Sequence, residues 1–329
     1  MWSLLKWGRQ SKLKIIPAED QSEYHIGSTH ADEHIFEAVV VRPMHQGVID
    51  QLNVLKVNFG INVYDLVSVE GGALRIAKYG VEDISIDAVK IAYELHHVKK
   101  VVLIGLSCAP NFGIAHSFCR EYPNEDSVAL LLAKSEEILT EHLSELRMEM
   151  EISSYLLSLT EDGKKLKFFR VSPNKDSFHK SLAYSLPYRG RKEGDSVVVW
   201  CMDARFREAT KTYLRAVLGL DYYGLVSIPG GAKGIVDTGD ESAAMDCISS
   251  SVNFHGARNV HLINHMDCGA YGGSTAFCGI EDEIERLTMD LEVAAKFIVS
   301  KFPHVRVHTH MQRAEGEKVF FRMLKTFST

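Results

Sequence analysis

The sequence has few cysteines, no long apolar run and no excess of basic residues. Six cysteines among 329 residues are far fewer than a disulfide-stapled scaffold carries. No apolar stretch approaches the roughly 18–20 residues that span a bilayer, so we expect no transmembrane segment. The formal charge of −6 argues against a basic nucleic-acid-binding protein. With 46% hydrophobic and 24% charged residues, the composition is that of a globular protein with a buried core.

The first seven residues are basic and amphipathic, but they lack the apolar core and small-residue cleavage site of a secretory signal. We therefore expect a cytoplasmic protein whose cysteines are reduced and available as thiolates. Residues 1–34 are expected to form an arm that packs on the rest of the protein. A helix that docks on a membrane surface or a partner is the alternative for residues 1–7.

An internal repeat organises the rest of the chain. Four blocks recur in the same order and with nearly the same spacing: 38–45 with 196–203, 64–73 with 223–232, 101–105 with 260–264, and 161–170 with 314–322. This order predicts a first repeat over residues 35–171, a polar connector over 172–193 and a second repeat over 194–329.

Each repeat is predicted to be α/β. Short β-branched apolar runs, such as 39–41 and 197–200, are typical of parallel strands that are buried on both faces. Apolar residues at helical spacing, as in 87–97 and 281–299, predict helices between the strands. The alternation predicts parallel strands joined by crossover helices. We expect two tandem repeats, each a mostly parallel sheet flanked by helices, with a C-terminal β-hairpin.

Polar residues follow two predicted strands of the second repeat. One strand ends in Cys201-Met202-Asp203-Ala204-Arg205, and another ends in His265-Met266-Asp267-Cys268-Gly269. Side chains just beyond the carboxyl ends of parallel strands line the functional crevice of such sheets. Two thiolates and one imidazole suit tetrahedral zinc with an open fourth position, as in catalytic sites. Asp203 can turn toward such a metal, and Arg205 can hold its carboxylate with two parallel hydrogen bonds.

These residues resemble the signature of the β-class carbonic anhydrases, which is Cys-x-Asp-x-Arg after one strand and His-x-x-Cys after another. Cys201, Asp203 and Arg205 match the first motif, and His265 and Cys268 match the second. The resemblance covers most of residues 196–311. It implies zinc held by the two cysteines and the histidine, and reversible hydration of carbon dioxide to bicarbonate by a zinc-bound hydroxide. In this family the aspartate, held by the arginine, orients the hydroxide or closes the site as a fourth ligand.

The sequence also departs from the family. Many members carry an Arg-Asn pair where this chain has Ser227-Ile228-Pro229, so two alternatives stay open. One is hydrolysis of carbonyl sulfide or carbon disulfide, and the other is a zinc-stabilised scaffold or bicarbonate sensor with weak turnover. In the first repeat, Pro43 stands in the place of Cys201 and Leu106 in that of His265. We therefore expect one zinc ion per chain.

The resemblance also implies an oligomer, because β-class enzymes form dimers with active sites near the subunit interface. A duplicated chain can supply that pairing internally, with the first repeat lending Arg42 or His45 to the site. We expect a homo-oligomer, a dimer of two-repeat chains.

Two further patterns compete with this interpretation. The Cys201-x5-Arg207 spacing matches the phosphate loop of cysteine phosphatases, but it lacks the glycines that such loops need. His308 and His310 alternate on a predicted strand, where we expect a polar strand face rather than a metal site or proton relay.

Overall fold

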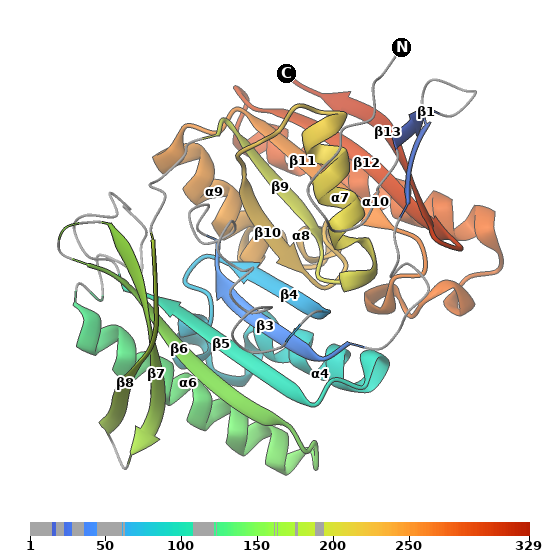
Figure 1. Ribbon diagram of the computed structural model, residues 1–329. Coiled ribbons are helices and arrows are strands. Elements are labelled where there is room, and N and C mark those ends of the chain that lie inside the picture. Colours follow the sequence, from blue (N-terminus) through green and yellow to red (C-terminus); the bar gives the residue numbers. More distant parts are fainter. Residues whose placement is uncertain are drawn as a thin grey trace.

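The computed structural model describes residues 15–17, 23–27, 36–44, 61, 63–107, 122, 124–160, 162, 164–174, 177–187 and 194–329. The strands in this part of the chain form one sheet in the order β1-β2-β13-β12-β11-β9-β10-β4-β3-β5-β6-β7-β8 (Figure 1). Their bounds are β1 Ile15–Pro17, β2 Glu23–Gly27, β3 Ala38–Pro43, β4 Tyr64–Val69, β5 Lys100–Leu106, β6 Glu151–Leu159, β7 Lys165–Asn174, β8 Ser177–Pro187, β9 Ser196–Cys201, β10 Gly224–Ile228, β11 Asn259–His265, β12 Arg306–Glu315 and β13 Lys318–Phe327.

Helices connect the strands, as the sequence predicts. The α-helices are α3 Leu74–Tyr79, α4 Ile84–His96, α6 Glu125–Glu145, α7 Ala204–Ala216, α8 Lys233–Thr238, α9 Ala243–His255 and α10 Ile280–Lys301. Short 3-10 turns lie at η1 Gly80–Glu82, η3 Gly239–Glu241, η4 Gly269–Tyr271 and η5 Ser274–Ala276. The longest helix, α10, has acidic residues in its first turn and Lys301 in its last, which suits the helix dipole.

The sheet has the same strand order on both sides of a central junction. Outward from the junction, one side runs β10, β9, β11, β12, β13 and the other runs β4, β3, β5, β6, β7. Each side is parallel except for its last hairpin. This confirms the expected α/β fold, a mostly parallel sheet with helices and terminal hairpins. Two repeats joined edge to edge would give this arrangement.

Two serines form the junction itself. Strands β10 and β4 pair antiparallel at Ser227 and Ser68, side by side in Figure 1. Ser68 Oγ donates to Leu225 O (2.9 Å), and Ser227 Oγ donates to Leu66 O (2.5 Å). These side-chain hydrogen bonds reinforce the single antiparallel backbone pairing at this buried point of contact between the two halves.

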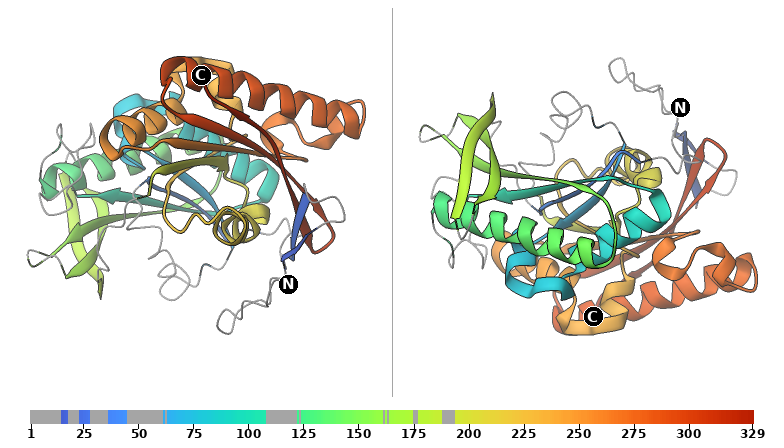
Figure 2. Two further views of the ribbon diagram at one scale, coloured as in Figure 1. Left: turned by 90° about the horizontal axis from the view of Figure 1, so that it is seen from above. Right: turned by 90° about the horizontal axis from the view of Figure 1, so that it is seen from below.

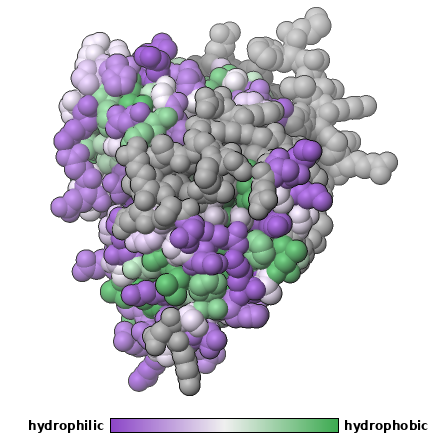
Figure 3. Space-filling model, turned by 90° about the vertical axis from the view of Figure 1, so that its left-hand side faces the viewer, coloured by the Kyte–Doolittle hydropathy of each residue, from purple (hydrophilic) through white to green (hydrophobic). Residues whose placement is uncertain are grey.

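Helices cover both faces of the sheet (Figure 2). One core cluster joins β-strand side chains to α4, α6, α9 and α10. The other face carries a second cluster, on which α7 contributes Leu214. On the face shown in Figure 3, hydrophobic side chains form separate patches among hydrophilic ones. None of the helices in the described ranges is long and apolar enough to cross a membrane.

Two segments form strands where the sequence predicts a polar connector and a packed arm. The expected connector contains strand β8, which pairs with β7 and extends the sheet. Its inward-facing side chains include both the apolar Phe178 and the charged Lys180, so its hydrophobic alternation is weak. Within the expected arm, β2 pairs with β13 and buries Ile26. Residues 1–7 lie outside the described residues.

Three histidines gather on the α7 face of the sheet. The ring nitrogens His261 Nδ1 and His310 Nε2 are 3.2 Å apart, and His310 Nδ1 lies 3.1 Å from the hydroxyl of Tyr213. The ring of His308 stacks on that of His261. Burial, reinforced by the neighbouring His308, lowers the pKa of His261 to about 3. Burial and the neighbouring His261 hold the pKa of His310 well below its usual value, so both rings are neutral in the folded protein at neutral pH.

This cluster makes the fold sensitive to acid. A histidine that is protonated near pH 6.5 when unfolded, but near pH 3 when folded, binds its proton only in the unfolded chain between these values. Stability is therefore full above about pH 6.5 and is lost as the pH falls, by about 1.4 kcal/mol per pH unit for each such proton. We expect urea unfolding of His261→Phe to show a pH slope between pH 6 and 4 that is shallower by about this amount. An unchanged slope would show that His261 takes up its proton in the folded state.

Candidate metal centre

Two adjacent parallel strands bring the predicted metal-binding side chains together. Cys201 is the last residue of β9 and His265 is the last of β11, and these strands pair with Ile263 beside Trp200. The sulfur atoms of Cys201 and Cys268 are 3.7 Å apart. One ligand atom from each of Cys201, His265 and Cys268 lies within 4.8 Å of the others.

A turn after β11 folds Cys268 back toward His265. Asp267 has φ of 56°, in the left-handed region that aspartate tolerates better than most residues. Its backbone N–H donates to Glu283 Oε1, and its Oδ1 accepts from the Ser274 N–H (3.1 Å). Glu283, in the acidic first turn of α10, thus stabilises the turn that contains Asp267. The sequence does not predict the roles of Asp267 and Glu283, because both roles depend on the backbone conformation of this turn.

The donor atoms fit a zinc ion. His265 Nδ1 lies 2.8 Å from Met266 O, so this nitrogen donates its proton and Nε2 carries the lone pair. His265 Nε2 is buried and has no hydrogen-bond partner among the described residues. A buried acceptor without a partner is costly, and a metal ion would satisfy it. Two sulfurs and one imidazole nitrogen are a common donor set for zinc.

The electrostatics of the three groups couple metal binding to the loss of protons. The hydrogen bond with the Cys268 thiol, together with burial, raises the pKa of Cys201 well above its usual value. Burial alone would lower the pKa of His265, but the neighbouring Cys201 and Asp203 raise it. The protein by itself therefore resists the thiolates and neutral imidazole that bind metals, and metal binding would release protons.

Asp203 and Arg205 form a buried pair beside the donors. Arg205 Nε and Nη2 donate to Asp203 Oδ2 over 2.9 and 2.7 Å, and Oδ2 lies 3.9 Å from His265 Nε2. Burial would raise the pKa of Asp203, but Arg205 holds it at about 2. Arg205 also donates to Asp267 Oδ2 (2.8 Å) and Asp267 O (2.9 Å). It thereby ties the two strand-end motifs together.

The other half of the chain supports this site with residues that the sequence did not indicate. Asp65 Oδ1 accepts from the Ala204 N–H (3.2 Å), and Asp65 Oδ2 lies 2.5 Å from His96 Nδ1. Arg42, expected to contribute, is instead buried and donates to Pro43 O. His45 lies outside the described residues.

Arg207 does not face Cys201 as a phosphate clamp would. Its Nη1 donates to Tyr64 O (2.6 Å), and its guanidinium carbon lies 3.8 Å from the centre of the Tyr64 ring. Helix α7 begins already at Ala204. Arg207 is thus a junction residue, and the structure gives no support to the phosphatase alternative.

The remaining cysteines stand apart from the metal centre. Cys247 is buried and accepts from the Glu70 N–H, and Cys278 is exposed, in keeping with core and surface thiols. Cys108 and Cys119 fall outside the described ranges. Pro43 and Leu106 offer no donor, and the described residues contain a single cluster that could hold a metal ion.

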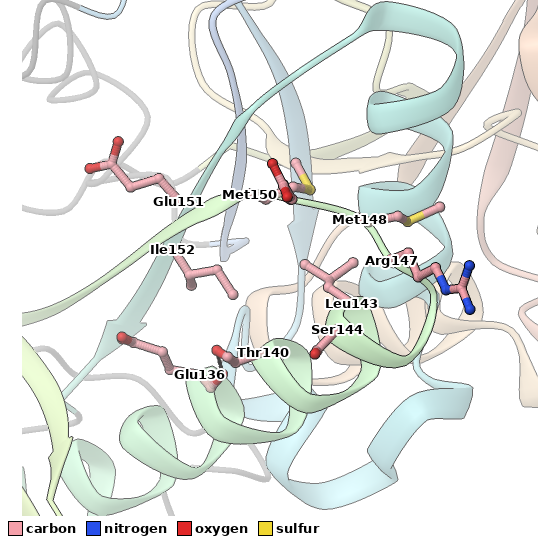
Figure 4. A pocket seen from close by; sticks show the side chains of 10 residues that line it. Glu136, Thr140, Leu143, Ser144, Arg147, Met148, Met150, Glu151 and Ile152 are labelled. Carbon is pink, nitrogen blue, oxygen red and sulfur yellow. Dashed lines mark hydrogen bonds between the residues drawn. The ribbon is translucent and has the colours of Figure 1, made fainter.

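A cavity of about 870 Å³ lies elsewhere, between α6 and the start of β6 (Figure 4). Glu136 and Thr140 reach it from the helix, and Glu151 and Ile152 from the strand. The carboxylate of Glu136 lies 3.5 Å from Arg170 Nη1, which gives it a structural partner. None of the metal-centre residues lines this cavity.

Comparison with known proteins finds a similarity in the C-terminal part. Residues 192–311 match the family described as "Putative carbonic anhydrase", and all five residues of the two motifs fall within this range. The C-terminal part of the chain is therefore similar to this family, in agreement with the resemblance seen in its sequence.

Two relatives come from Rickettsia, and each is described as an uncharacterized protein. The relative from Rickettsia bellii is 29% identical over 139 residues, which are 40% of this chain and 84% of the relative. The relative from Rickettsia conorii is 26% identical over 131 residues, 38% of this chain and 70% of the relative.

Proposed function

We propose that this protein is a zinc-dependent carbonic anhydrase that hydrates carbon dioxide reversibly to bicarbonate. Cys201, His265 and Cys268 would hold the zinc ion. The observation that carries the proposal is the buried His265 Nε2. It has no hydrogen-bond partner in the described part of the chain and lies near two thiols and an arginine-held carboxylate. A bound zinc ion lowers the pKa of water toward neutrality and so supplies a hydroxide nucleophile.

The chain's own residues then have distinct tasks. Asp203, whose pKa is about 2, is ionised at neutral pH and can only accept hydrogen bonds. Its carboxylate would accept a hydrogen bond from the nucleophile, without taking its proton, and would so orient the nucleophile toward the substrate. Arg205 fixes the carboxylate in place with its paired donors. Asp203 Oδ2 lies 3.9 Å from His265 Nε2. A change in the Asp203 side-chain torsions would make this carboxylate a fourth ligand, which would close the site.

The same proposal covers the stoichiometry and assembly of the protein. We infer one zinc ion per chain, because Pro43 and Leu106 take the place of donors in the other half. The β10–β4 junction would then correspond to a dimer interface within one chain, and the assembly would be a homodimer of such chains. A cytoplasmic location is part of the proposal.

Metal content and carbon dioxide hydration, measured together, test the proposal. Elemental analysis of freshly purified protein should give about one zinc per chain, and stopped-flow hydration should rise with pH as bound water deprotonates. Zinc without hydration, but with hydrolysis of carbonyl sulfide or carbon disulfide, would move the function to those substrates. Zinc without any turnover would indicate a scaffold or bicarbonate sensor. Protein that takes up no zinc would overturn the proposal.

A further inference from the structure

We propose that Asp65 and His96, from the half of the chain opposite the candidate metal ligands, position Asp203 in the metal site. The inference rests on the proposed function for the role of Asp203. Its physical basis is a set of contacts that cross the β10–β4 junction and converge on the residues on either side of Asp203.

Two consecutive residues of β4 hold the backbone on both sides of Asp203. The Leu66 N–H donates to Met202 O over 3.1 Å, and Asp65 Oδ1 accepts from the Ala204 N–H over 3.2 Å. Both peptide groups that flank Asp203 are therefore fixed by the other half of the chain. The direction in which the Asp203 side chain leaves the backbone follows from these two hydrogen bonds. The hydrogen bonds from Arg205 then fix the side-chain torsions of Asp203.

The support behind Ala204 is rigid and buried. Asp65 is 0% exposed and His96 is 6% exposed, and the two side chains are 2.5 Å apart. The His96 ring packs edge-on against Phe36 at 4.3 Å between centroids. A buried carboxylate needs a partner of this kind to offset its lost hydration. The pair thus links α4, at whose end His96 lies, to the first residue of α7.

Helix capping does not account for Asp65. Helix α7 already has its own N-cap, because Asp203 Oδ1 accepts from the Arg205 N–H (2.9 Å). Asp65 satisfies a different amide, the one in the peptide bond that Asp203 itself forms with Ala204. Without it, this peptide group keeps only the longer hydrogen bond from the Phe206 N–H to Asp203 O (3.4 Å), and we expect the Asp203 carboxylate to move toward His265. The expected consequence is a change in the metal site, and not only a loss of helix stability.

The test compares Asp65→Ala with Asp65→Asn in the full-length, metal-loaded protein. Asparagine keeps an oxygen acceptor for the Ala204 amide, whereas alanine removes it. The matched control is Asp83→Ala, which removes another buried aspartate of the same half that accepts from a helix amide (Ser85 N–H, 3.0 Å) and pairs with Arg75. The readouts are zinc content, the visible absorption spectrum of the cobalt(II)-substituted protein, and kcat and KM for carbon dioxide hydration.

We expect Asp65→Ala to keep its zinc but to shift the cobalt(II) spectrum, because Asp203 enters the coordination sphere. Its kcat should fall about ten- to a hundredfold with little change in KM, the loss that a misplaced group typically causes. Asp65→Asn should recover most of the spectrum and rate, and Asp83→Ala should match the wild type in both. An Asp65→Ala spectrum and kcat equal to those of the control would overturn the proposal. The spectrum answers this question even if the wild type hydrates no carbon dioxide, so the failure of the proposed function would be seen separately.

Discussion

Cys268→Ser is expected to lose its zinc and its carbon dioxide hydration together. The sulfur of Cys268 lies 3.7 Å from that of Cys201, and a hydroxyl is a much poorer zinc ligand than a thiolate. Substitutions of residues that merely support a metal ligand typically cost 10- to 100-fold in affinity, so loss of a direct ligand should cost more than about 100-fold. Zinc content after dialysis and the stopped-flow rate measure both effects.

Cys247→Ser is the matched control for this variant. Cys247 is also a buried cysteine in the same half, but its sulfur accepts from the Glu70 N–H and lies outside the metal cluster. This variant should keep about one zinc per chain. If Cys268→Ser kept both zinc and activity, the ligand assignment would be wrong. If it folded only poorly while Cys247→Ser folded well, the metal would contribute mainly to folding.

The sequence predicts that the candidate metal ligands lie close together where the relevant spacing is local. Cys201 and His265 each end an apolar strand, and parallel strands place their carboxyl ends along one edge. A residue two or three positions beyond a strand end must then lie close to this edge of the sheet. The donor set and the Asp203–Arg205 pair could therefore be proposed before the fold was known, and the structure brings these residues together.

Residues that act across the junction were not predictable in this way. Asp65 takes the place of Gly224 in the repeat, and its importance depends on an antiparallel pairing of β4 and β10 that no local pattern encodes. The one available signal was a charged residue inside the buried strand Tyr64–Val69. A buried charge in an apolar strand indicates a partner elsewhere. Strand β8 escaped prediction for the opposite reason, since a half-exposed edge strand has little hydrophobic alternation.

Asp203→Asn is expected to keep its zinc and to lose about 10²-fold or more in kcat, the usual loss when one preorganised hydrogen-bond partner of the reacting group is removed. Asparagine has nearly the same shape, but its amide presents a donor where the carboxylate presents an acceptor. The pKa of Asp203 is about 2, so the wild-type carboxylate is ionised throughout the neutral range and loses its charge only as the pH falls through about 2. The rise of activity through neutral pH must then come from another group. We expect the variant to show the same rising pH profile at a lower plateau.

Asp267→Asn separates the loss of one charge beside Arg205 from the loss of the orienting carboxylate. Asp267 also accepts from Arg205 (2.8 Å), and asparagine tolerates its left-handed backbone conformation as well as aspartate does. This variant removes one of the two carboxylate charges that contact Arg205 but leaves Asp203 in place. It should therefore lose less activity than Asp203→Asn. Equal losses of kcat in the two variants would show that the number of carboxylates beside Arg205 limits the rate. If the activity of Asp203→Asn no longer rose with pH, Asp203 would be the titrating base.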